Sequence, residues 1–255
     1  YAGFGHKQFG ELTYGNMVTI TDEVKQSDLA NTYSLTDGLL ETSARRVTQY
    51  VYNGDYGSNK VKFGAYYGGS SKRNIKNVDL KNNRKNTWGT GLIFNHEIDS
   101  IQNVTVAAGF TRQISENANK TAYYSNAYAL GLAYNFVHTT YGLDLAHKDT
   151  KNKDGAGNKV KNNEVTAVIR QGLNEDWNVY AMYSYKTEKT LPVGSAYSKS
   201  TDRQFLVGTE YYVYNQGSLK VKPFLEWQAT RTKYENDTKD RIRDFKTVIG
   251  LRAYW

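Results

Sequence analysis

The chain has 255 residues, a formal net charge of +8 and no cysteine. Its mean hydropathy is -0.70, and no stretch approaches the ~18 uninterrupted apolar residues of a membrane-spanning helix. The lack of cysteine excludes disulfide frameworks and cysteine-ligated metal sites. A membrane β-barrel remains compatible with this average, because only half of the residues in each of its strands are apolar.

The excess positive charge lies in two segments. Residues 71–86 have a net charge of +5 and residues 148–163 a net charge of +3, and the two account for the total of +8. Both segments are rich in Asn and Lys and nearly lack the aromatic side chains that stack on bases. We interpret them as solvated loops and expect no nucleic-acid partner. A less favoured alternative places them near anionic lipid headgroups.

In chain order, about thirteen segments alternate apolar and polar residues with the period of two that is typical of β-strands. They lie near residues 1–7, 9–17, 47–53, 59–69, 87–96, 103–113, 125–136, 139–148, 164–173, 177–187, 202–214, 219–231 and 243–255. The last segment places Phe245, Leu251 and Trp255 on one face. An outward aromatic residue on a closing strand is typical of outer-membrane barrels.

The connections between these segments alternate in length. The short ones lie near residues 8, 54–58, 97–102, 137–138, 174–176 and 215–218, and the long ones near 18–46, 70–86, 114–124, 149–163, 188–201 and 232–242. Outer-membrane barrels have short periplasmic turns and longer external loops. The sequence therefore predicts an all-β fold, a transmembrane antiparallel β-barrel that forms a single domain over residues 1–255.

The charged residues of these strands fix which face meets lipid. Five of them lie opposite the apolar positions, and they are Asp144, Arg170, Glu210, Glu226 and Arg252. Shifting the register by one residue would place all five in lipid, at a cost on the order of 10 kcal/mol. Aromatic residues near strand ends predict interfacial girdles on the apolar face. They are Tyr50, Tyr52, Tyr67, Trp88, Tyr128, Tyr134, Phe136, Trp177, Tyr185 and Trp255.

The number of strands also predicts where the two ends lie. With about thirteen strands, Trp255 falls on the side of the short turns and Tyr1 on the side of the long loops. Closed bacterial barrels have an even number of strands, which brings both ends to one side. We therefore expect an N-terminal piece with an odd number of strands, most simply three, to be missing from this sequence.

The longest connection, residues 18–46, combines acids with apolar residues. Its net charge is -2, and it includes Val24, Leu35 and Leu40. A loop of this length with its own apolar residues is expected to pack against other parts of the fold. In a wide barrel the available surface is the inner wall, where the loop would narrow the pore. The alternative is an external flap whose charges have no special role.

Residues 9–16 have the sequence FGELTYGN and are followed by the long connection. This stretch resembles the FGxxxxGR strand that precedes the third loop in the general diffusion porins of Gram-negative outer membranes. Residues 46–52, leading to 62–67, resemble the strand pair after this loop, and residues 248–255 resemble the closing strand. The resemblance runs from the family's fourth strand to its last, and thus also implies three absent strands.

The resemblance implies a 16-stranded homotrimeric channel for ions and small hydrophilic solutes, in contact with outer-membrane lipid and lipopolysaccharide and without a cofactor. About thirteen of the sixteen strands would be present here. The implied pore constriction comprises Asp22, Glu23, Asp28, Arg45 and Arg46. The expected pore wall comprises Glu11, Asn16, Lys62, Arg170, Glu210, Glu226 and Arg252. Asn16 replaces the arginine that ends the family's motif, so ion selectivity does not follow from the resemblance.

An enzyme would need a nucleophile and a base in suitable positions. The histidines His6, His96, His138 and His147 are scattered among strand ends, and none has a matching partner by spacing. Residues 149–155 resemble a calcium loop, but lysines occupy ligand positions, so we expect no metal site. We expect no catalytic activity. The remaining alternative is another outer-membrane barrel, such as an adhesin, an autotransporter translocator or a substrate-specific monomeric channel.

Overall fold

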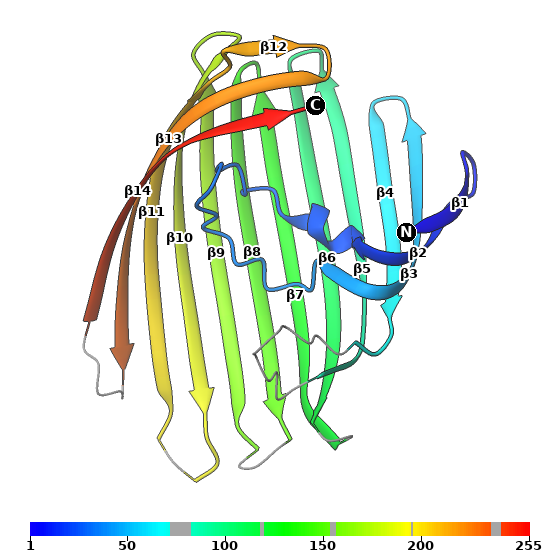
Figure 1. The fold of residues 1–255 in the computed structure, drawn as a ribbon, viewed down its shortest axis with the longest axis vertical. Helices are drawn as coiled ribbons and strands as arrows, with labels where there is room; N and C mark the ends of the chain where they lie inside the picture. The colour runs from blue at the N-terminus through cyan, green and yellow to red at the C-terminus, as the bar shows by residue number, and fades with distance from the viewer. Residues whose placement is uncertain (72–82, 118–119, 154–156, 195, 236–240) are drawn as a thin grey trace.

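The computed structural model describes residues 1–71, 83–117, 120–153, 157–194, 196–235 and 241–255. Its strands form one strongly curved antiparallel sheet, in which strands adjacent in sequence pair with each other (Figure 1). They are β1 (Ala2–His6), β2 (Gly10–Val18), β3 (Ser43–Tyr56), β4 (Asn59–Gly68), β5 (Asn83–Asp99), β6 (Gln102–Asn117), β7 (Lys120–Phe136), β8 (Thr139–Asn152), β9 (Lys159–Gly172), β10 (Trp177–Leu191), β11 (Ser198–Tyr211), β12 (Tyr214–Gln216), β13 (Leu219–Glu235) and β14 (Arg241–Tyr254). A short 3₁₀ helix, η1 (Ile20–Val24), lies between β2 and β3. Within these residues, no helix has the length and hydrophobicity needed to cross a membrane.

The predicted strands correspond to the observed ones. The short strand β12 pairs with β13 next to β11, so β11 and β12 together are one interrupted strand that matches the predicted segment 202–214. Counted in this way, the described sheet has the thirteen strands that the alternation predicts. The two edges of the sheet are β1 and β14.

Four predicted long connections are mostly strand, so that part of the prediction is wrong. The sequence predicts loops at 114–124, 149–163, 188–201 and 232–242, yet strand pairing extends to Thr190↔Ser198 and Lys151↔Lys159. Their polar and charged residues lie at the ends of long hairpins. Backbone pairing satisfies the amide and carbonyl groups there whatever the side chains are. Residues 72–82 and 154–156 of the lysine-rich segments lie outside the described residues.

The two faces of the sheet follow the predicted register. We call the face that contacts residues 19–42 the inner face and the opposite face the outer face. Asp144, Glu210 and Glu226 lie on the inner face, where they bond to these residues or to their neighbours. The outer face carries exposed apolar side chains, among them Val165, Ile169, Phe205, Leu225 and Ile249. Predicted girdle residues are also exposed there, namely Tyr50, Tyr67, Trp88, Tyr128, Phe136, Trp177 and Trp255.

The two rims of the sheet differ. We call the rim where β10 ends and β11 begins the loop side and the other rim the turn side. Ala2 pairs with Tyr14 and His6 with Gly10, so β1 runs toward the turn side. Tyr254 pairs with Lys220, beside the turn at 217–218, so the chain ends on the turn side, as the strand count predicts.

Candidate functional site

Residues 19–42, which we call the inner loop, cross the inner face of the sheet in front of its central strands (Figure 1). The inner loop is slightly shorter than the predicted loop, 18–46, because Arg45 and Arg46 belong to β3. Apolar side chains of the inner loop pack against the wall in three clusters. Ile20 lies with Val47 and Tyr66, Val24 and Leu40 lie with Ala107 and Ala127, and Leu35 lies with Val168, Tyr180, Met182 and Leu206. Burial of these side chains stabilises the inward position of the loop.

Glycines of the wall let the start of the inner loop approach closely. A Cβ atom at Gly91 or Gly64 would lie 3.1 Å from Ile20, and one at Gly109 would lie 2.8 Å from Val24. At Gly131 and Gly142 the same atom would lie 2.0 Å from the Val24 carbonyl oxygen and 2.5 Å from that of Gln26. Any side chain at these last two positions would displace the loop backbone.

Three carboxylates of the wall hold the backbone of the inner loop. Asp144 accepts hydrogen bonds from the amides of Gln26 (2.8 Å) and Ser27 (2.9 Å). Glu164 accepts one from the amide of Asp37, at 2.9 Å. Glu226 accepts bonds from three successive amides, those of residues 31, 32 and 33, at 2.5, 3.0 and 3.0 Å. These carboxylates take the place of the strand or helix partners that a loop backbone lacks.

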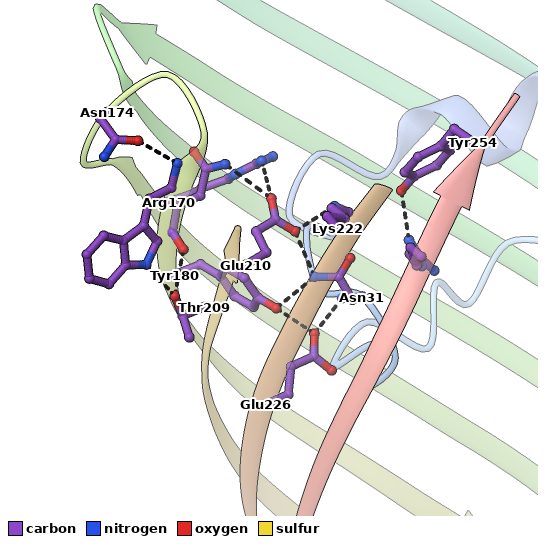
Figure 2. A network of polar contacts seen from close by, with 12 residues as sticks. Asn31, Arg170, Asn174, Tyr180, Thr209, Glu210, Lys222, Glu226 and Tyr254 are labelled. Atoms are coloured by element: carbon purple, nitrogen blue, oxygen red, sulfur yellow. Dashed lines mark hydrogen bonds and ion pairs between the residues drawn. The ribbon is translucent and has the colours of Figure 1, made fainter. Parts of the chain in front are cut away.

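Asn31 connects the inner loop to a polar network on β9, β10, β11 and β13 (Figure 2). Its side-chain amide donates to Glu210 at 2.8 Å and to the Tyr180 hydroxyl at 3.0 Å. Tyr180 in turn donates to Glu226, at 2.7 Å. Glu210 also pairs with Arg170 and, at 2.5 Å, with Lys222. The two buried acids are thus bonded on all sides, as buried charges require.

The end of the inner loop is held through Glu41. Its carbonyl oxygen accepts bonds from Thr21 (2.8 Å) and Tyr66 (3.0 Å), and its amide donates to Thr111 at 3.2 Å. Its carboxylate pairs with Lys148 at 3.3 Å. Both ends of the inner loop and its middle are therefore bonded to the wall.

The predicted constriction acids lie on the accessible part of the inner loop. Asp22 and Glu23 are on η1, and their side chains keep 42% and 49% of their accessible surface. Glu23 pairs with Lys62 of the wall at 2.5 Å. Asp28 pairs with Lys25 at 3.4 Å, within the loop.

The two predicted constriction arginines are placed differently. They form a bulge of β3 opposite Asn16, whose side-chain oxygen accepts a bond from the Arg46 amide at 3.2 Å, and Arg46 has a φ of 53°. Arg45 lines a cavity of about 610 Å³ on the loop side, together with Arg84. Arg46 is exposed and does not line this cavity.

The predicted wall residues fall into two groups. Glu11, Asn16 and Lys62 line a second cavity of about 510 Å³, on the turn side of η1, and Arg252 is exposed near the end of β14. Arg170, Glu210 and Glu226 lie on the predicted face, but the two acids are buried, with 2% and 0% exposure, where they bond to the inner loop. The sequence predicts that Asp144 faces inward but does not predict its bonds to the inner loop. It also does not predict the bonds of Asn31 and Glu164, the position of Arg84 or the glycine contacts.

The histidines do not form a catalytic set in the described residues. His96 bonds to Asn59, and His147 bonds to Asn163 and Asp149. Over the same residues, no cluster of three or more His, Asp or Glu side chains could hold a metal ion.

Comparison with known proteins identifies the family. A sequence model described as Gram-negative porin matches residues 1–222. The chain belongs to this family. The porin is 23% identical to a major outer membrane protein of Pasteurella multocida over 261 residues, a match that covers 100% of this chain and 67% of the relative.

Solved structures share the fold of this porin. A loop-deletion mutant of OmpT, an outer membrane protein of Vibrio cholerae, superposes with a TM-score of 0.64 at 17% identity, over 97% of this chain and 76% of that one. An anion-selective porin from Comamonas acidovorans superposes with a TM-score of 0.58 at 14% identity, over 96% of this chain and 73% of that one. The predicted outer-membrane β-barrel fold, porin channel function and outer-membrane localisation are confirmed.

Proposed function

We propose that this porin is a passive, non-catalytic channel for ions and small hydrophilic solutes, formed by a single domain, and that its inner loop is the constriction. The observation that supports the constriction most directly is the set of carboxylates, Asp144, Glu164 and Glu226, that holds the loop backbone across the inner face. A loop fixed in this way narrows the path without closing it, and its exposed acids meet the passing solute.

Within this proposal the predicted residues have distinct roles. Asp22, Glu23 and Asp28 supply negative charge at the constriction, while Arg45, together with Arg84, supplies positive charge on the loop side. Glu11, Asn16, Lys62 and Arg252 line the water-filled path. Arg170, Glu210 and Glu226 act through the inner loop, because their bonds fix its middle. We assign no direct role to Arg46.

The partners of this porin follow from its family and its outer face. One Vibrio cholerae OmpT structure is described as a trimer form, and we propose a homotrimer for this chain as well. The exposed apolar residues of the outer face would contact outer-membrane lipid, with lipopolysaccharide on the loop side. Neither cofactor nor nucleic acid enters this proposal.

Solute efflux from proteoliposomes tests the channel proposal. Vesicles that hold the purified porin are loaded with radiolabelled sugars of increasing size, and protein-free vesicles serve as the control. We expect monosaccharides to leave quickly and large oligosaccharides to be retained, since the inner loop limits the width of the path. Retention of all sugars by folded, inserted porin would contradict the proposal.

A charge variant of the inner loop tests the constriction. The triple substitution Asp22→Asn, Glu23→Gln and Asp28→Asn removes three negative charges without shortening the loop. We expect the reversal potential in a salt gradient to shift toward anion selectivity, because the acids no longer attract cations. Substitution of Asp55 and Asp99 with Asn, at the turn-side ends of β3 and β5, provides a control. An unchanged reversal potential in the triple variant would show that these acids do not lie at the constriction.

A further inference from the structure

Three arginines lie side by side on the outer face, at the loop-side ends of β11, β13 and β14. The register pairs Arg203 directly with Arg231, and Arg231 directly with Arg243. In the next row toward the loop side, Lys233 pairs with Arg241. We call Arg203, Arg231 and Arg243 the arginine row. Like charges directly opposite each other destabilise a sheet, so this row calls for a negatively charged partner.

The described part of the chain does not supply that partner. All three arginines are exposed, and no ion pair with a described residue involves them, Lys233 or Arg241. The nearest acid of the outer face, Glu235, pairs with Lys199 at 3.4 Å. Arg203 lies over the Tyr185 ring, at 5.9 Å from its centroid, which leaves its guanidinium free to bind a further group. A cavity of about 300 Å³ lies among Arg203, Arg231 and their neighbours.

Apolar residues continue directly from the arginine row toward the turn side. The adjacent row of the outer face has Phe205, Ala229 and Phe245, paired in the same order. The Trp227 ring lies 6.5 Å from that of Phe205 and 6.2 Å from that of Phe245. The outer face thus changes from an apolar aromatic surface to a row of positive charges between two adjacent rows of paired residues.

The position of the arginine row along the strands matches the boundary of a membrane. Tyr211, at the other end of the apolar stretch of β11, is eight residues from Arg203, which is about 27 Å along a strand at about 3.4 Å per residue. A strand tilt of roughly 40° reduces this to about 21 Å, close to the ~25 Å apolar band of outer-membrane barrels. The arginine row therefore lies at headgroup level.

We propose that the arginine row binds the phosphate groups of an anionic lipid in the leaflet on the loop side, whose acyl chains lie against Phe205, Trp227 and Phe245. Guanidinium groups bind phosphate through two parallel hydrogen bonds, and three in a row match a headgroup with more than one phosphate. The free phosphate ion shares the charge but not the acyl chains, so the apolar row favours the lipid. This inference rests on the lipid-facing orientation of the outer face proposed above.

The test compares two triple variants of the full chain, refolded without lipid. One carries Arg203→Gln, Arg231→Gln and Arg243→Gln. The matched control, Lys7→Gln, Lys60→Gln and Lys220→Gln, loses the same charge from exposed residues on the turn side. Binding of bisphosphorylated lipid A in detergent is measured by native mass spectrometry. We expect the arginine variant to bind on the order of 100-fold more weakly than the unaltered porin, at about fivefold per basic residue near an anionic surface, and the control to bind normally.

Further binding measurements distinguish the phosphate of a lipid from the free phosphate ion. Dephosphorylated lipid A should bind the unaltered porin weakly, and inorganic phosphate at the same concentration should not compete with lipid A. A variant with lysine at all three positions should keep part of the affinity, because it keeps the charge. Equal binding by the arginine variant, equal loss in the lysine control, or competition by inorganic phosphate would each overturn the proposal. The conductance of the arginine variant, measured on the same samples, should equal that of the unaltered porin. Loss of conductance with lipid A binding intact would contradict the proposed channel function and would leave the proposed lipid site standing.

Discussion

At the scale of single residues, Glu226 positions the middle of the inner loop. Its carboxylate accepts hydrogen bonds from three successive loop amides and from Tyr180, and it is completely buried. Substitution Glu226→Gln replaces one acceptor oxygen by a donor that faces these amides. We expect the free energy of unfolding to fall by about 2–3 kcal/mol, measured by urea titration, and single-channel currents to become noisier.

The matched control for this prediction is Glu235→Gln, on the same strand. Glu235 is part of a half-exposed ion pair with Lys199, so its substitution should change stability by less than about 1 kcal/mol. If both variants lost the same stability, the bonds from Glu226 to the inner loop would not be what stabilises this part of the fold.

Gly131 offers a second residue-scale prediction, because it limits how closely η1 approaches the wall. A Cβ atom at this position would lie 2.0 Å from the Val24 carbonyl oxygen. Substitution Gly131→Ala should displace the inner loop and cost about 1–3 kcal/mol, measured as a lower melting temperature in detergent. Gly69→Ala is the control, since its nearest neighbour would be 3.9 Å away. Equal melting temperatures for the two variants would contradict the close contact.

The residue-scale details could be predicted only in part. The alternation of apolar and polar residues predicts that Glu210 and Glu226 face inward, and they do. It does not predict that the inner loop covers them, because the path of the loop depends on contacts between residues far apart in the sequence. Asp144 faces inward next to the small residue Gly142. An inward acid beside small or apolar residues indicates that its carboxylate bonds to a segment inside the barrel.

At the scale of elements, the hairpins on the loop side are longer than their composition predicts. Pairing of β10 with β11 continues to Thr190↔Ser198, through residues rich in Lys, Ser and Thr. We expect the amides of residues 187–190 and 199–201 to exchange slowly with deuterium, because they are hydrogen-bonded in the sheet. Residues 192–194, in the connection, should exchange quickly. Mass spectrometry of peptic fragments measures both, and equally fast exchange in the two groups would show that the hairpin ends at the membrane boundary.

The surroundings of these hairpins explain why their sequences predict loops. Polar residues that lack apolar alternation indicate a loop in most sheets, because strands usually cover a core. Beyond the membrane a barrel hairpin has water on both faces, so its residues lose that alternation while the backbone bonds continue. The bulge at Arg45 and Arg46 is a second feature of the strands that the alternation does not predict. Two residues there oppose the single Asn16, and nothing in the local pattern marks the extra residue.

At the scale of the whole molecule, the sheet and its orientation were predictable, while the packing inside it was not. A period of two over thirteen strands and the high cost of placing charges in lipid leave one register. The inner loop was expected inside because of its length and apolar residues, and Ile20, Val24 and Leu35 are buried there. Its anchors come from β8, β9 and β13, and these contacts depend on the curvature of the sheet.

The most direct test of the account is the current through single molecules of the unaltered porin in a planar lipid bilayer. A water-filled path narrowed by a fixed inner loop predicts stable conductance that appears in discrete steps, grouped in threes for a trimer, and rises with salt concentration. Folded porin that inserts into the bilayer without carrying any current would contradict the account.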